Sequence, residues 1–278
     1  MEFLELIKAL FYGLVEGITE WLPVSSTGHM ILFEEFVKFK QSEEFMAMFR
    51  VVIQLGAILA VVILFWNKIW PFCADKKQNY IKKDSWNLWF RILVATLPAL
   101  VLGLLLDDWL DAHFYNFFTV AAMLIVYGVL FILVENNRKN KQTRINSLLE
   151  LTYRDAFIIG LWQVLAMIPG TSRSGATIVG GLLLGASRAV AAEFTFFLAI
   201  PVMAGASLLK VLKFGLSFTG EEIAVLVVGM VVAFVVSLAA IRFLMGYVKR
   251  HDFKVFGWYR IVLGIVLLAY YFLLRTPA

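Results

Sequence analysis

Two short stretches of this sequence place side chains suited to phosphate chemistry between long apolar runs. The first polar stretch, residues 16–29, reads Glu-Gly-Ile-Thr-Glu-Trp-Leu-Pro-Val-Ser-Ser-Thr-Gly-His and holds carboxylates, hydroxyls and an imidazole. The second polar stretch, residues 169–177, reads Pro-Gly-Thr-Ser-Arg-Ser-Gly-Ala-Thr and adds a guanidinium. Hard cations such as Mg²⁺ take carboxylates with phosphate oxygens, and a guanidinium fork also suits phosphate. The combination favours metal-assisted phosphoryl transfer, with a carrier for an anionic substrate as the alternative.

The first polar stretch predicts a helix, a break and a second helix. Glu16 and Glu20 are four residues apart, so on a helix they share one face. Pro23 disfavours helical angles at the residue before it, and the hydroxyls that follow are natural N-caps for a helix beginning near Gly28. These hydroxyls belong to Ser25, Ser26 and Thr27. The acids then face the partially positive start of the next helix, a setting for a cation together with a phosphate.

The composition indicates that both stretches lie in an integral membrane protein. The 278-residue chain is 61% hydrophobic and 16% charged, with a mean hydropathy of +0.83. A soluble domain is about 45–50% apolar and about 25% charged. The single cysteine, Cys73, excludes an intrachain disulfide and a cysteine metal cluster. We expect no nucleic-acid partner and no cleavable signal peptide.

Apolar runs of about 20 residues predict α-helices rather than a barrel, and therefore an all-α polytopic bundle. Six segments are long and apolar enough to span a bilayer. They run over about 45–66, 86–106, 114–134, 193–212, 221–245 and 255–274.

The distribution of basic residues predicts the orientation of these spans. Loops 67–85, 135–155 and 246–254 are rich in Lys and Arg, whereas 107–113 and 213–220 have only one Lys between them. By the positive-inside rule, the first three loops are cytoplasmic and the other two are external, as are both termini. Two histidines, His113 and His251, are expected in loops at the surface.

The predicted directions of the spans make the two halves of the chain inverted relative to each other. Pro23 matches Pro169 and Ser26 matches Ser172, which supports an internal repeat weakly. We predict a single membrane domain, 1–278, with repeat 1 at about 1–135, a cytoplasmic linker at about 136–152 and repeat 2 at about 153–278. Each repeat would consist of a polar-tipped hairpin followed by three spans.

The two hairpins are predicted to be re-entrant. The arms 28–38, 156–168 and 175–187 would form about 16–20 Å of helix, too short for a hydrocarbon core of about 30 Å. The arm 3–22 could span by itself, which leaves an eight-span alternative. We favour hairpins that enter from opposite faces and meet near the midplane, because interrupted segments at matching positions in two halves point to a binding site.

Some of these polar side chains also have a purely structural interpretation. A buried arginine within a membrane needs an anionic partner, so Arg173 could bind phosphate or act as an internal strut to Glu16 or Glu20. His29 is a lone imidazole and could be a satisfied core group. Its position one turn into a helix beside two acids instead favours proton transfer.

The two polar stretches together closely resemble the undecaprenyl-diphosphate phosphatase family of bacteria, also called the bacitracin-resistance protein family. The resemblance extends over nearly the whole chain, including Val-Ile-Gln-Leu-Gly-Ala-Ile-Leu-Ala-Val at 52–61 and Ala-Glu-Phe-Thr-Phe-Phe-Leu-Ala-Ile-Pro at 192–201. It implies hydrolysis of undecaprenyl diphosphate to undecaprenyl phosphate and inorganic phosphate. This reaction recycles the lipid carrier for peptidoglycan synthesis and counters bacitracin. The site is expected to open to the outer face of the bacterial cytoplasmic membrane.

The resemblance also implies roles for individual residues. It assigns a divalent cation, Mg²⁺ or Ca²⁺, to Glu16 and Glu20, and the diphosphate to Arg173. The nucleophile is Ser26, His29 or water, and we favour Ser26 with His29 as its base. The remaining predicted phosphate-binding residues are Ser25, Thr27, Gly170, Thr171, Ser172, Ser174 and Thr177. The principal alternative is an inverted-repeat transporter or lipid flippase for an anionic substrate.

Overall fold

The computed structural model describes the chain except residues 1–2, 74–80, 140 and 274–278. Its regular structure is helical, and the described residues form only two isolated β-bridges and no strand. The elements are α1 (Phe3–Thr19), α2 (Ser26–Phe36), α3 (Glu43–Leu64), α4 (Trp66–Ile69), α5 (Lys83–Phe114), α6 (Phe117–Arg138), η2 (Leu148–Glu150), α7 (Tyr153–Leu165), α8 (Arg173–Leu183), α9 (Arg188–Phe214), α10 (Gly220–Tyr247) and α11 (Lys254–Leu273).

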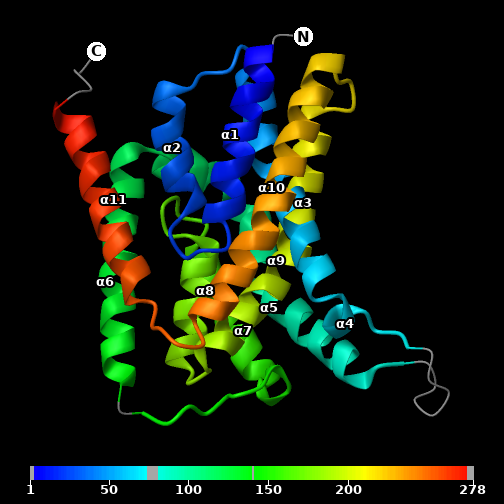
Figure 1. Cartoon of the computed structure of the whole chain (residues 1–278), viewed down its shortest axis with the longest axis vertical. Helices are drawn as coiled ribbons and strands as arrows, with labels where there is room; N and C mark the ends of the chain where they lie inside the picture. The colour runs from blue at the N-terminus through cyan, green and yellow to red at the C-terminus, as the bar shows by residue number, and fades with distance from the viewer. Residues whose placement is uncertain (1–2, 74–80, 140, 274–278) are drawn as a thin grey trace.

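Six of the described helices are long and apolar enough to cross a membrane: α3, α5, α6, α9, α10 and α11. The prediction of an all-α polytopic protein with six helices able to span is therefore confirmed, and α1 is not among these helices. The start of α1 and the end of α11 lie at the same end of the molecule, as do the α5–α6 and α9–α10 connections (Figure 1). Part of the predicted loop 67–85 lies outside the described residues.

The prediction of a loop at 107–113 is wrong. These residues continue α5, which ends only at Phe114, and His113 lies in its last turn rather than in a loop. The segment contains no Pro or Gly to stop a helix. The chain breaks two residues further on, where the side chain of Asn116 accepts a hydrogen bond from the Thr119 amide at 2.9 Å and caps α6.

Four shorter helices form two hairpins, α1 with α2 and α7 with α8. α1 and α2 have 17 and 11 residues, and α7 and α8 have 13 and 11. The turn between α1 and α2 lies in the middle of the molecule, beside the turn that leads into α8 (Figure 1). The two polar stretches thus meet inside the bundle.

Glycines set how closely each hairpin packs on a long helix. A Cβ atom at Gly13 of α1 would lie 2.5 Å from the carbonyl oxygen of Gly229 in α10. A Cβ atom at Gly160 of α7 would lie 2.3 Å from the carbonyl oxygen of Ala95 in α5. Any larger residue would push these backbones apart.

A buried acid fixes the start of α11. Glu135, at the end of α6, accepts hydrogen bonds from Arg188 at 2.8 and 2.6 Å and from the Phe253 amide at 3.0 Å. Its side chain is fully buried. Because the carboxylate has three donors, its burial is compensated, and α6, α9 and α11 are tied together at this end.

Candidate active site

The two polar stretches use the same backbone device at their turns. Ser25 and Ser172 have φ values of 72° and 71°, the only positive φ angles at non-glycine residues in the described chain. The hydroxyl of Ser25 accepts from the Gly28 amide at 3.3 Å, and that of Ser172 accepts from the Gly175 amide at 3.1 Å. Each serine therefore caps the helix that follows it. Strained backbone at two matching positions is typical of a functional site.

This geometry corrects the correspondence expected between the halves. The sequence match paired Ser26 with Ser172, but the structural equivalent of Ser172 is Ser25. The shift is one residue. It places Ser26, the first residue of α2, opposite Arg173, the first residue of α8. The same position therefore carries a hydroxyl in one hairpin and a guanidinium in the other.

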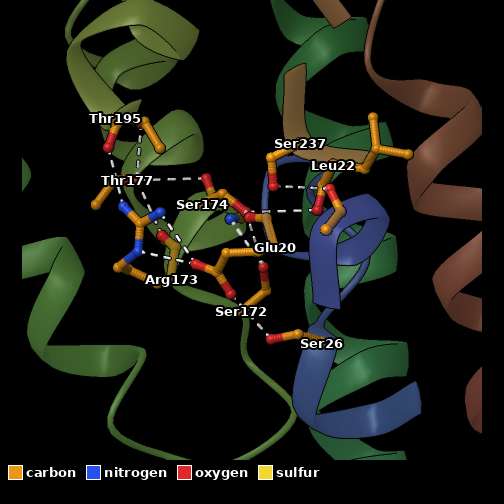
Figure 2. A network of polar contacts seen from close by, with 11 residues as sticks. Glu20, Leu22, Ser26, Ser172, Arg173, Ser174, Thr177, Thr195 and Ser237 are labelled. Atoms are coloured by element: carbon orange, nitrogen blue, oxygen red, sulfur yellow. Dashed lines mark hydrogen bonds and ion pairs between the residues drawn. The ribbon is translucent and has the colours of Figure 1, made fainter. Parts of the chain in front are cut away.

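A carboxylate from the first polar stretch and the guanidinium from the second are in direct contact. Arg173 donates to Oε1 of Glu20 from Nε at 3.2 Å and from Nη2 at 3.1 Å (Figure 2). Its Nη1 donates to the carbonyl oxygen of Thr195 at 2.9 Å. Both charged side chains are largely buried. The expectation that Arg173 has an anionic partner is confirmed.

Glu20 is also the hydrogen-bond partner of the candidate nucleophile. The hydroxyl of Ser26 donates to Oε2 of Glu20 at 3.0 Å, on the carboxylate oxygen that Arg173 does not use. The hydroxyl of Ser174 donates to the main-chain carbonyl of Glu20 at 3.0 Å. Figure 2 shows Glu20 between Ser26 and Arg173. A carboxylate in this position can accept a proton from the serine.

The other predicted phosphate-binding residues have varied surroundings. Thr177 bonds the Arg173 carbonyl at 2.9 Å and the Thr195 hydroxyl at 2.8 Å, so it supports the arginine. The hydroxyl of Thr171 is buried and has no partner in the described part of the chain. Thr27 is half-buried in the first turn of α2. The Gly170 carbonyl accepts a hydrogen bond from Arg260 at 2.9 Å.

Glu16 lies in the last turns of α1 and is 1% exposed. Its Oε1 atom is buried without a hydrogen-bond partner in the described chain. A buried carboxylate oxygen with no donor is costly unless something else compensates its charge. No group of three or more His, Cys, Asp and Glu side chains suited to a metal occurs among the described residues. The unpartnered oxygen of Glu16, one turn before Glu20, is of the ligand type that a hard cation takes together with phosphate and water.

The ring nitrogens of His29 bond to residues other than Ser26 in the described chain. Its Nδ1 lies 2.7 Å from the Ser25 carbonyl oxygen, and its Nε2 lies 2.6 Å from the hydroxyl of Tyr259 in α11. Because a carbonyl only accepts, Nδ1 carries a proton, and in the neutral imidazole Nε2 then accepts from Tyr259. The predicted pair, Ser26 as nucleophile with His29 as its base, is therefore not hydrogen-bonded in the described structure. The partner of Ser26 is Glu20.

Two residues at the site were not predicted, and both belong to α11. Tyr259 holds His29 and stacks on its ring at 5.6 Å. Arg260 is fully buried and donates to main-chain carbonyls of both polar stretches. An ionisable residue inside a predicted span is the signal that could have identified Arg260. Tyr259 carries no such signal, because aromatic residues are common in membrane helices.

Comparison with known proteins identifies the family of this chain. The family described as "Bacitracin resistance protein BacA" matches residues 9–266. An undecaprenyl-diphosphatase of Desulfitobacterium hafniense is 61% identical over 272 residues, which cover 98% of each chain. An undecaprenyl-diphosphatase of Enterococcus faecalis is 58% identical over 269 residues, covering 96% of this chain and 98% of the relative. This chain therefore belongs to the bacitracin resistance protein BacA family.

Proposed function

We propose that this protein hydrolyses undecaprenyl diphosphate to undecaprenyl phosphate and inorganic phosphate in a bacterial membrane. The observation that carries the proposal is the contact of Glu20 with both Arg173 and Ser26 inside the bundle. The identity of the substrate comes from the names of the relatives, which are undecaprenyl-diphosphatases. The reaction regenerates the monophosphate carrier for envelope polymers and removes the diphosphate form that bacitracin sequesters.

The position of the site suits a lipid substrate. An inverted repeat of two re-entrant hairpins would place both polar stretches near the midplane, in a cavity open to the outer face. The packing of α1 on α10 and of α7 on α5 at corresponding glycines supports this arrangement. The polyprenyl chain would then stay in lipid while the diphosphate enters the polar site.

The chemistry follows from the contacts of Glu20. Ser26 attacks the terminal phosphorus with its Oγ, and Glu20 accepts the hydroxyl proton. The bond from that phosphorus to the bridging oxygen breaks, and undecaprenyl phosphate leaves. Water then hydrolyses the phosphoserine, releasing inorganic phosphate and restoring the hydroxyl. In a direct route, Glu20 activates water instead, and Ser26 orients it.

Arg173 supplies the electrostatic part of catalysis. In the free protein its fork is satisfied by Glu20 and Thr195. A terminal phosphate would compete for the fork, so substrate binding and release of Glu20 from the ion pair are linked. Such a clamp stabilises charge on the transferred phosphoryl group.

A divalent cation, Mg²⁺ or Ca²⁺, would be held by Glu16 and Glu20. The unpartnered Oε1 of Glu16 supports this assignment. When bound, such an ion neutralises charge on the diphosphate. The hydrogen bonds of the Arg173 fork go to Glu20 and Thr195, and none of those described goes to Glu16.

The test is phosphate release from undecaprenyl diphosphate by the detergent-purified protein. We expect release that needs a divalent cation and is abolished by Arg173→Gln. A transporter or flippase would release no phosphate, and that result would replace the proposed function. If EDTA left the rate unchanged, the metal-binding role given to Glu16 and Glu20 would be wrong while the phosphatase activity would stand.

A further inference from the structure

Arg260 of α11 is a buried cation without an anionic partner in the described chain. Its side chain is 0% exposed, and its guanidinium lies 5.5 Å from the ring centroid of Tyr127. Its hydrogen bonds all go to main-chain oxygens. A buried arginine is expensive, so its persistence here calls for a use beyond packing.

The carbonyls that Arg260 binds come from both polar stretches. Nη1 donates to Pro23 at 3.3 Å, and Nη2 donates to Gly170 at 2.9 Å and to Thr171 at 2.7 Å. One rigid fork thus connects two turns that are far apart in sequence. A planar guanidinium can do this, whereas a lysine ammonium lacks the second nitrogen of the fork.

The bond to Thr171 also fixes the direction of a neighbouring amide. The described chain has no cis peptide bond, so the N–H of Ser172 points opposite to the Thr171 carbonyl. That carbonyl points to Arg260, and the Ser172 N–H therefore points away from it. Ser172 is the N-cap of α8, and its amide has no hydrogen-bond partner within the described residues. This unpaired donor directly precedes Arg173 in the chain.

We propose that Arg260 is a positioning residue for phosphoryl transfer. It holds the two polar stretches together and turns the Ser172 amide toward the phosphate site, next to Arg173. The role rests on the proposed phosphatase function, since it concerns donors to the same terminal phosphate. The hydrogen bonds of Arg260 in the described chain go to main-chain carbonyls and not to Glu20 or Ser26, so it acts through the backbone it binds.

Gly175 offers an independent way to disturb this arrangement. A Cβ atom at Gly175 would lie 2.7 Å from Nη1 of Arg260, its nearest neighbour, and 3.3 Å from Cβ of Ser172. The variant Gly175→Ala therefore displaces the guanidinium without removing it. It separates the position of the fork from the presence of its charge.

The experiment compares Arg260→Lys and Gly175→Ala with a matched control. Arg138→Lys is that control, because Arg138 donates to a single carbonyl, that of Leu182 at 3.0 Å, near the other end of α8. Phosphate release gives kcat, inhibition by inorganic phosphate gives Ki, and hydrogen exchange by mass spectrometry follows residues 20–29 and 169–177.

For Arg260→Lys we expect kcat to fall about 100-fold, the effect of a misplacement of about 1 Å. The Ki for inorganic phosphate should rise about tenfold, equivalent to the loss of one charge-assisted hydrogen bond. Exchange should increase in both segments together. Gly175→Ala should change the same quantities by less, and Arg138→Lys should change none of them.

The Ki distinguishes positioning from simple instability, because a smaller folded fraction lowers kcat without altering Ki. An unchanged Ki in both Arg260→Lys and Gly175→Ala would overturn the proposal. So would faster exchange in one segment only. If the wild-type protein releases no phosphate, the proposed function fails, but exchange and calorimetric binding of inorganic phosphate still test Arg260.

Discussion

The two hairpins have the same backbone conformation at their turns and differ in the charges of their side chains. Their turns have serines at φ values of 72° and 71° that cap the following helices in the same way. At corresponding positions the first hairpin has Glu16 and Ser26, and the second has Gln163 and Arg173. Neither hairpin alone holds both an acid and a guanidinium at its turn. The site therefore exists only where the hairpins meet, and each supplies half of its chemistry.

The ion pair between the hairpins should give the largest effects. Arg173→Gln leaves Glu20 buried without its charge partner, and losing an arginine clamp lowers kcat by about 10³-fold or more. Breaking a buried pair also destabilises a protein by about 3–5 kcal/mol. Phosphate release and the thermal midpoint measure the two losses separately.

The double variant Glu20→Gln with Arg173→Gln sharpens this test. It leaves no unpaired charge, so we expect it to be more stable than either single variant while remaining inactive. A double variant less stable than both singles would show that the two hairpins do not meet through this pair.

Glu16 and Gln163 test whether the difference between the halves is functional. Glu16→Gln gives both hairpins an amide at this position, and we expect a loss of about 10²-fold in activity together with a higher cation requirement. A metal titration of phosphate release measures both.

The matched control is Gln163→Leu. Both amide atoms of Gln163 are buried without a partner in the described chain. Replacing an unsatisfied polar group by an apolar one of similar size removes its desolvation cost, of about 1–3 kcal/mol. We expect retained activity and equal or greater stability. A loss of activity would mean that the second hairpin has kept a polar function at this position.

Much of this architecture is a local property of the sequence and was predictable. The spans follow from apolar length, and the expectation that Arg173 pairs with Glu16 or Glu20, or binds phosphate, follows from the cost of burying an arginine in a membrane. The direction of a side chain is a different matter. His29 is three residues from Ser26, yet its side chain faces Tyr259. Spacing along a helix does not by itself fix the direction in which each side chain points.

The contributions of α11 could not be read from local patterns. Arg260 binds carbonyls of Pro23 and Thr171, which are remote from it in the chain, and no motif marks such contacts. The end of α5 was also predicted wrongly. A charged segment without Pro or Gly reads as a loop in a membrane protein, but it continues the helix when nothing in it stops the backbone hydrogen bonds.

The capping serines test whether the two turns are equivalent in energy. Ser25→Ala and Ser172→Ala each remove a cap, worth about 0.5–2 kcal/mol, and leave a Cβ at positive φ. The glycine variants should lose less, because glycine adopts this conformation freely. Thermal midpoints of the four variants should show similar alanine–glycine differences at both positions. Unequal differences would mean that the turns match in shape only.

Tyr259→Phe should give the smallest effect, and it tests a feature found only in the first hairpin. The second hairpin has Ala176 where the first has His29, so it has no counterpart of the bond to Tyr259. If Glu20 is the base for Ser26, loss of the tyrosine hydroxyl removes one neutral hydrogen bond, and kcat should fall by less than about tenfold. The pH dependence of kcat should keep its shape, because the group that accepts the serine proton is unchanged. A shift of its acidic limb in Tyr259→Phe would instead identify His29 as the proton acceptor and return Glu20 to a purely electrostatic role.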